Sequence, residues 1–177
     1  MTSADLDTTT VAIRSTQIMA DGTPADFEAV IHADAYNRES VREPPATRGR
    51  GPAAFHATAL WLREAFTNLA FEIHDVVSDH DVVVLHTTIS GRHTGTFVAY
   101  TDDARPLQAF PATGKQFAVT QTHWCRIADG KLVEHWANRD DLGMSMQLGW
   151  APPSPMYVFR MQRATVAARR RAHRRSV

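Results

Sequence analysis

A histidine and an aspartate on a predicted hairpin are the residues best suited to chemistry. His123 lies in the first strand-like run, residues 116–127, and Asp140 follows the second, residues 132–138. The Asp-Gly pair at 129–130 favours a type I′ turn, which joins two antiparallel strands. In a pocket, a carboxylate beside an imidazole can act as a general acid/base pair, and partial burial raises the pKa of such a carboxylate. The pattern therefore predicts an acid/base site on this hairpin.

A two-residue loop also fixes which residues share a face of the hairpin. Counting outward from the loop places five polar or aromatic residues on one face: Gln121, His123, Trp136, Asn138 and Asp140. Their convergence predicts a small-molecule pocket. A bulged turn would instead exchange His123 for His135 on this face. Plain surface positions for the histidine and the aspartate are a further alternative.

The rest of the chain contains the elements that must hold this hairpin. Apolar residues recur with a helical period in residues 23–31 and 53–68, whereas residues 11–20 are poorly periodic and residues 37–52 predict a loop. Beyond residue 68 the apolar period becomes that of strands. Helices followed by antiparallel strands predict an α+β fold, with the N-terminal helices packed on one face of a curved sheet that encloses the pocket.

Composition describes one domain with an uneven distribution of charge. The 177 residues include 19 Lys and Arg, 19 Asp and Glu, and one cysteine. Residues 151–177 hold seven arginines and no acidic residue, so this segment carries +7 and residues 1–150 carry −7. We expect a flexible N-terminus (1–10), a folded domain (11–150) and a basic tail (151–177) that begins with prolines and can form a helix.

The basic tail has three interpretations. It is a solvated helix or a disordered end, or it docks on the acidic body of its own or a partner chain. Contact with nucleic acid or a membrane is the least favoured, because aromatic residues are not interleaved with the arginines. No segment has the length of a membrane span or the order of a signal peptide, so the expected location is cytoplasmic. The nine histidines lack metal-site spacing, and no metal is predicted.

Several short motifs in the C-terminal half of the domain form a recognisable pattern. They are residues 111–115, Asp129-Gly130, Glu134-His135-Trp136, Asp140-Asp141-Leu142-Gly143 and Gln147-Leu148-Gly149. With these motifs the chain resembles, over about residues 20–150, the SnoaL-like polyketide cyclases of the nuclear-transport-factor-2-like superfamily. The resemblance implies a cone-shaped α+β barrel and a homodimer formed through the open face of the sheet.

The same resemblance implies a reaction and the residues for it. Family members close a ring by an intramolecular aldol reaction, with an aspartate as acid/base and no metal or organic cofactor. Asp140 occupies the aspartate position, His123 is the matching histidine and Asn37 the matching asparagine. The other residues expected to contact the substrate are His93, Phe117, Gln121, Trp136 and Asn138.

Two other functions remain open on the same scaffold. One is a non-catalytic module for binding a small molecule or for dimerisation, because one fold carries many functions. The other is a hydroxylase or epoxide hydrolase in which Asp140 positions water. The cyclase, acting in secondary metabolism on a hydrophobic polyketide-like substrate, is the function that the resemblance favours.

Overall fold

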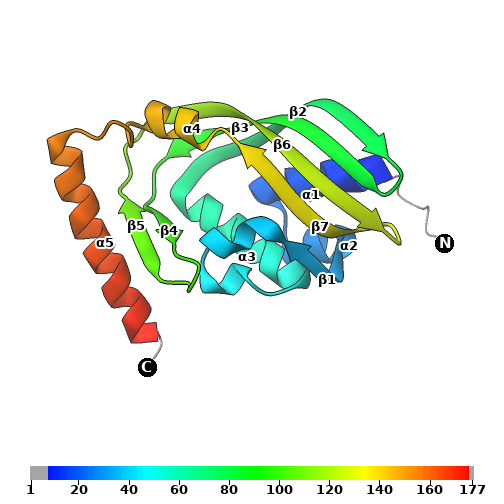
Figure 1. Cartoon of the computed structure of the whole chain (residues 1–177), viewed down its shortest axis with the longest axis horizontal. Helices are drawn as coiled ribbons and strands as arrows, with labels where there is room; N and C mark the ends of the chain where they lie inside the picture. Colours follow the sequence, from blue (N-terminus) through cyan, green and yellow to red (C-terminus); the bar gives the residue numbers. More distant parts are fainter. Residues whose placement is uncertain (1–7, 176–177) are drawn as a thin grey trace.

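Helices occupy most of the first third of the chain and strands most of the remainder, in a computed structural model that describes residues 8–175 (Figure 1). The helices are α1 (Thr8–Asp21), α2 (Pro24–Val30), α3 (Gly51–Ala65), α4 (Asp141–Leu148) and α5 (Pro155–Arg175), with two short 3-10 helices, η1 (Arg38–Arg42) and η2 (Pro45–Thr47). The strands are β1 (Ile31–Asn37), β2 (Phe66–Asp79), β3 (Val82–His93), β4 (Phe97–Tyr100), β5 (Pro106–Phe110), β6 (Gln116–Ala128) and β7 (Lys131–Arg139).

Five of the strands form one curved, mixed sheet in the order β1-β7-β6-β3-β2. Strand β1 runs parallel to β7, and the other neighbours are antiparallel. Strands β4 and β5 form a separate two-stranded sheet. Figure 1 shows α1, α2 and α3 under the concave side of the large sheet. The predicted α+β fold, with N-terminal helices on one face of a curved sheet, is confirmed.

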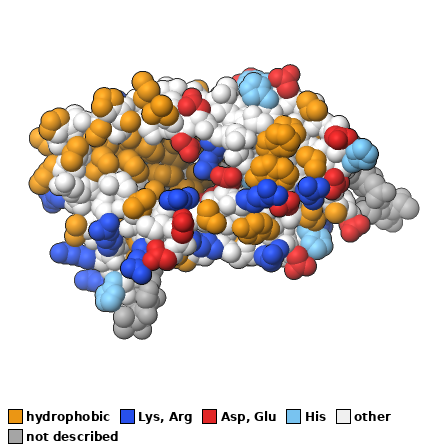
Figure 2. Space-filling view, in the orientation of Figure 1, with side chains coloured by type: hydrophobic (Ala, Val, Ile, Leu, Met, Phe, Trp, Pro, Cys, Tyr) orange, Lys and Arg blue, Asp and Glu red, His pale blue; other side chains and the backbone are white. Residues whose placement is uncertain are grey.

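Two clusters of buried side chains hold these layers together. The first joins α1, α2 and α3 to the sheet, with Ile18 and Phe27 packed against Leu85 and Leu132. The second is aromatic, with Phe66 at its centre, and lies nearer α4. A cavity lies between the helices and the sheet, and Figure 2 shows the surface hollowed there, with hydrophobic side chains inside.

The helix α1 differs from the sequence prediction, which found little helical period in residues 11–20. Its buried face contains Ser15 and Thr16 beside Val11 and Ile18. Both hydroxyls donate to the carbonyl oxygen of Ala12, which satisfies them inside the helix. Polar residues on the buried face hid the amphipathic pattern. Of the predicted flexible segment, residues 1–7 lie outside the described part of the chain and residues 8–10 open α1.

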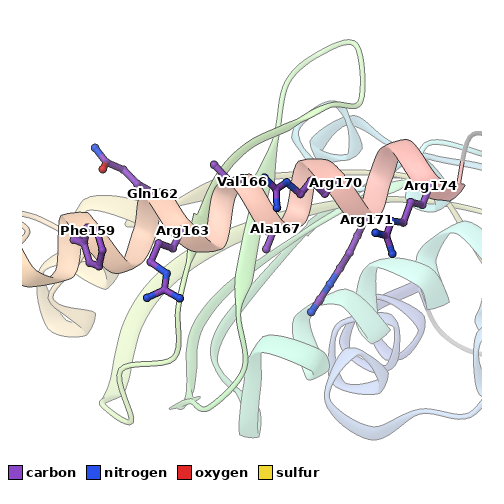
Figure 3. A pocket seen from close by; sticks show the side chains of 8 residues that line it. All are labelled: Phe159, Gln162, Arg163, Val166, Ala167, Arg170, Arg171 and Arg174. Carbon is purple, nitrogen blue, oxygen red and sulfur yellow. The ribbon is translucent and has the colours of Figure 1, made fainter.

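The basic tail is helical between residues 155 and 175 and packs on β5 of its own chain. The hydroxyl of Tyr157 donates to the carbonyl oxygen of Pro111 at 2.9 Å, and the guanidinium of Arg169 donates to the carbonyl oxygens of Pro106 and Leu107 at 3.2 Å. The outward side of α5 carries exposed side chains, shown in Figure 3: Phe159, Gln162, Arg163, Val166, Ala167, Arg170, Arg171 and Arg174. Hydrogen bonds to backbone carbonyls and the packing of Tyr157 in the aromatic cluster therefore attach this helix, and within the described residues no ion pair joins it to the acidic body.

Thr165→Val should loosen this attachment. The buried Thr165 hydroxyl oxygen accepts from the backbone N–H of Ala109 at 2.9 Å and from the Gln108 amide at 3.0 Å. Valine keeps the shape but leaves the Ala109 N–H without its acceptor, which costs about 1–3 kcal/mol. Urea unfolding followed by circular dichroism measures this loss. The reciprocal change at the exposed neighbour, Val166→Thr, is the control, and equal stability of the two variants would contradict the assigned role.

Candidate active site

The cavity under the sheet has a volume of about 460 Å³ and is lined mainly by apolar side chains. These come from α3, β2, β4, β5 and α4, and include Trp61, Leu62, Phe71, Phe97, Phe110 and Met144. Such a cavity has the size and apolar character of a small-molecule site. Most of its charged and histidine side chains lie on β6, β7, η1 and the start of α4.

Two histidines from neighbouring strands meet at this polar end. His123 Nδ1 on β6 lies 2.9 Å from His135 Nε2 on β7. His123 Nε2 is 2.9 Å from Gln121 Oε1, and His135 Nδ1 is 3.0 Å from Asn37 Oδ1 at the end of β1. The amide oxygen of Asn37 also accepts the backbone N–H of Glu39, which caps η1. Strand pairing therefore builds a continuous polar network along one wall of the cavity.

Burial keeps both imidazoles neutral. The pKa of His123 is lowered to about 4, first by burial and then by the positive charge of Arg139. The pKa of His135 is lowered well below its ordinary value, by burial and then by the charges of His123 and Arg139. A neutral imidazole in an apolar cavity has a free lone pair, so this pair can accept a proton from a bound molecule.

Charged groups surround the histidine pair. The Arg139 guanidinium lies 3.3 Å from a carboxylate oxygen of Glu39 and 3.6 Å from one of Asp141. Glu43 also lines the cavity and is 3% exposed. Burial raises the pKa of Glu43, against the opposing effect of the Thr58 hydroxyl, which donates to its carboxylate at 2.6 Å. Sequence analysis did not select these groups, and it named His135 only as the alternative to His123 that a bulged turn would place on this face.

The predicted register of the hairpin is wrong beyond its first pair. Ile127 pairs with Leu132 as expected, but Arg126 pairs with Glu134, so Val133 is an extra residue in β7. Such a bulge reverses the facing of every later residue in its strand. His135 consequently joins His123 on the cavity face, rather than replacing it as a bulged turn was expected to do.

The same bulge turns two predicted site residues to the outer face of the sheet. Trp136 pairs with Trp124, their rings stacked with centroids 5.8 Å apart, and Asn138 pairs with Thr122. The prediction that Trp136 and Asn138 share the face of His123 is wrong. The inward positions on β7 are instead His135, Ala137 and Arg139.

Asp140 lies outside the cavity, at the junction between β7 and α4. It is exposed, and its carboxylate accepts the backbone N–H of Gly143 at 2.7 Å as the N-cap of α4. A Cβ at Gly143 would approach a carboxylate oxygen of Asp140 to 2.1 Å, so glycine makes room for this cap. The expected convergence of Asp140 with His123 is wrong, because β7 ends at Arg139 and Asp140 begins the turn into α4.

Three of the eight sequence-selected residues line the cavity, namely Asn37, Gln121 and His123. Phe117 and His93 lie in the aromatic cluster instead: Phe117 packs on Phe66, and His93 lies between Phe66 and Trp150 with no exposed surface. Alternation along β6 was the signal for Gln121 and His123. His135 could have been found only by recognising the bulge at Val133, and no glycine or proline in the sequence marks that position.

Between residues 8 and 175, no group of three or more histidine, cysteine, aspartate or glutamate side chains is placed to hold a metal ion. Within the same residues, no helix has the length and apolar character needed to cross a membrane.

Comparison with known proteins gives matches over most of the chain. The model of a family described as SnoaL-like polyketide cyclase matches residues 9–148. The aklanonic acid methyl ester cyclase DnrD of Streptomyces peucetius is 33% identical over 135 residues, which are 76% of this chain and 85% of DnrD. The nogalonic acid methyl ester cyclase of Streptomyces nogalater is 30% identical over 129 residues, 72% of this chain and 87% of that protein. The structure of TsrD from Streptomyces laurentii matches with a TM-score of 0.64 at 24% identity, over 81% of this chain and 98% of TsrD.

Proposed function

Because the chain belongs to the SnoaL-like polyketide cyclase family, we propose that it closes a ring in a polyketide-derived ester by an intramolecular aldol reaction. The observation that carries the proposal is the apolar cavity of about 460 Å³ with a neutral imidazole pair on its wall. The cavity excludes water from a planar apolar substrate, and the imidazole supplies the base that the reaction needs.

His123 is the base that this cavity supports best. It takes a proton from the carbon between two carbonyl groups of the substrate, which leaves an enolate. The enolate carbon forms a new bond to the carbon of a second carbonyl, whose oxygen becomes an alkoxide. The proton then passes from the imidazole to that alkoxide, so the product is an isomer of the substrate and no oxidant or cofactor is consumed.

Side chains around the imidazole pair would bind the substrate and the developing charge. Trp61 and Phe97, whose ring centroids are 4.7 Å apart, offer apolar surface to a planar polyketide. The positive charge of Arg139 can stabilise an enolate oxygen. This electrostatic interaction is stronger in a cavity of low dielectric than in water. Burial raises the pKa of Glu43, and in its protonated form this residue can donate a hydrogen bond to a substrate carbonyl.

The acid/base role of Asp140 stays a prediction that comes from the family resemblance. The carboxylate is committed to the N-cap of α4, and direct proton transfer would require it to leave that position. His123 and Asp140 are therefore the two competing bases, and variants of each distinguish them.

Two substrates test the function directly. They are aklanonic acid methyl ester and nogalonic acid methyl ester, the esters that appear in the names of the related cyclases. The expected result is conversion of one of them, or a close analogue, to a product of equal mass with a different chromatographic retention. DnrD provides the positive control. If DnrD converts its ester while this chain converts neither ester nor any analogue, the proposal fails.

A homodimer formed through the outer face of the sheet also stays a prediction. That face carries the stacked Trp124 and Trp136, and the Arg38 guanidinium lies 4.4 Å from the centre of the Trp136 ring. Aromatic and arginine side chains are typical of protein interfaces. A monomer at micromolar concentration in sedimentation equilibrium would contradict this assembly. The cytoplasmic location expected from the sequence also stays a prediction.

A further inference from the structure

Four side chains form one chain of contacts along the polar end of the cavity. Asn37 Oδ1 lies 3.0 Å from His135 Nδ1, His135 Nε2 lies 2.9 Å from His123 Nδ1, and His123 Nε2 lies 2.9 Å from Gln121 Oε1. The chain crosses three neighbouring strands, from β1 through β7 to β6. It links the imidazole proposed as the base to a buried amide at the opposite end.

The amide of Asn37 fixes the proton at its end of the chain. Its oxygen accepts the backbone N–H of Glu39 at 3.1 Å, so the atom that faces His135 is an oxygen and not a nitrogen. An amide oxygen can only accept. His135 must therefore carry its ring proton on Nδ1, where it donates to Asn37.

The position of that proton determines the tautomer of the second ring. A neutral imidazole has one N–H, so the Nε2 atom of His135 is bare and can only accept. His123 must then donate to it from Nδ1. Since burial also keeps His123 neutral, its Nε2 atom is unprotonated, and the lone pair of this atom faces the amide of Gln121. The order of protons follows from the Asn37 amide and the burial of the two rings.

Gln121 can stabilise both protonation states of His123. Its amide carries an oxygen on one side and an NH2 group on the other, and a half turn exchanges them. The NH2 group can donate to a bare Nε2 atom, whereas the oxygen, which lies 2.9 Å away in the structure, can accept from a protonated one. The contact is thus preserved when Nε2 gains a proton.

We propose that His135, held by Asn37, is a positioning residue that keeps the proton of neutral His123 on Nδ1 and so makes His123 Nε2 the atom that takes the substrate proton. The substrate displaces the Gln121 amide from Nε2 before the proton is transferred, and the Gln121 oxygen then accepts from the new N–H. The positive charge appears only while the enolate carries the negative charge beside it. When the proton passes to the alkoxide, both rings are neutral again. This inference rests on the proposed cyclase function.

Other charged groups face the same space and bear on the protonation of the pair. They are Glu39 and Arg42 on η1, Glu43 after it, Arg139 on β7 and Asp141 on α4. Arg139 opposes a proton on either histidine when the cavity is empty. The two carboxylates beside Arg139 offset part of its charge. The empty cavity therefore favours the neutral, ordered pair.

Nitrogen NMR of the histidine rings tests the proton order without any substrate. In the full chain labelled with ¹⁵N at pH 7, we expect protonated Nδ1 and bare Nε2 atoms in both His123 and His135. In His135→Phe, the His123 proton should move to Nε2, where the Gln121 oxygen accepts it. A His123 proton found on Nε2 in the unmodified chain would overturn the inference, whether or not the cyclase activity is established.

Kinetics on a converted ester provide the second test. His135→Phe should lower kcat about 100-fold and change KM by less than about twofold, since general-base catalysis contributes at least this much. His135→Gln, whose amide can both donate to Asn37 and accept from His123, should recover most of the loss. His86→Phe, an exposed histidine on β3, is the matched control. Equal kcat values for His135→Phe and His86→Phe would overturn the positioning role of His135. If His135→Phe does not fold, His135→Gln and the NMR measurement on the unmodified chain still test this role.

Discussion

Lowering the pH from 7 to 4.5 is expected to remove a large part of the free energy of unfolding. His93 and His123 have pKa values lowered to about 4 by burial, and the pKa of His135 is lowered well below its ordinary value. In the unfolded chain, each histidine takes up a proton near pH 6.5. Between about pH 6.5 and pH 4 the unfolded state therefore binds more protons than the native state, and stability falls as the pH falls.

The size of this effect follows from the shifts. For His93 and His123, the difference between 6.5 and about 4 corresponds to about 3 kcal/mol each. Glu43 acts in the opposite direction, because its pKa is raised and the native state takes up its proton first on acidification. The net expectation is still a steep loss, since three buried histidines oppose one buried glutamate.

Urea unfolding at several pH values between 7.5 and 4.5 measures this loss. His93→Leu should flatten the dependence by about 1.4 kcal/mol per pH unit between pH 6 and 4.5, even if it lowers stability at pH 7. His86→Gln changes an exposed histidine and is the control. A slope in His93→Leu equal to that of the unmodified chain would show that His93 does not stay neutral in the native state.

His123→Gln is expected to lower turnover by about 100- to 10,000-fold, the range by which a general base accelerates proton transfer. Glutamine retains hydrogen bonding at this position but cannot accept the substrate proton. Binding depends mainly on the apolar lining, so KM should change little. Steady-state kinetics with the converted ester measure both quantities, and circular dichroism confirms that the variant is folded.

Two changes at Asp140 separate its possible roles. Asparagine caps helices about as well as aspartate but cannot serve as an acid/base, so Asp140→Asn should keep both stability and turnover. Asp140→Ala removes the cap and should cost about 1 kcal/mol of stability, with turnover again within a few fold. If Asp140→Asn instead abolishes turnover in a folded protein while His123→Gln remains active, the aspartate is the base, as the family resemblance implies.

The contrast between β6 and β7 shows which parts of the site the sequence determines. Regular alternation along β6 was sufficient to place Gln121 and His123 on the inward face. In β7 the extra residue Val133 reverses the facing, and valine is equally common in regular strands. The bulge depends on how the strand pairs with its neighbours, which a single sequence does not reveal. The error moved Trp136 and Asn138 into the predicted site and left His135 out.

Fold class was easier to predict than the ends of individual elements. The α3 helix was expected to continue to residue 68, but it ends at Ala65, because Phe66 begins β2 and joins the aromatic cluster. A helix was predicted up to residue 31 and a loop from residue 37, with no strand between them, although residues 31–37 form β1. Its partner strand β7 lies about 100 residues later in the sequence. Pairing with so distant a strand overrides the local preference of the segment.

The β4–β5 sheet connects one wall of the cavity to the C-terminal helix α5. Phe97 and Phe110 from this sheet form one wall of the cavity, and α5 is attached to the opposite side of β5. The match to the family ends at residue 148, before α5 begins. One wall of the cavity is thus supported by a segment that lies outside the residues matched by the family model. If the proposed function holds, changes in the tail would alter the shape of this wall without altering the strands β6 and β7, which hold the histidine pair.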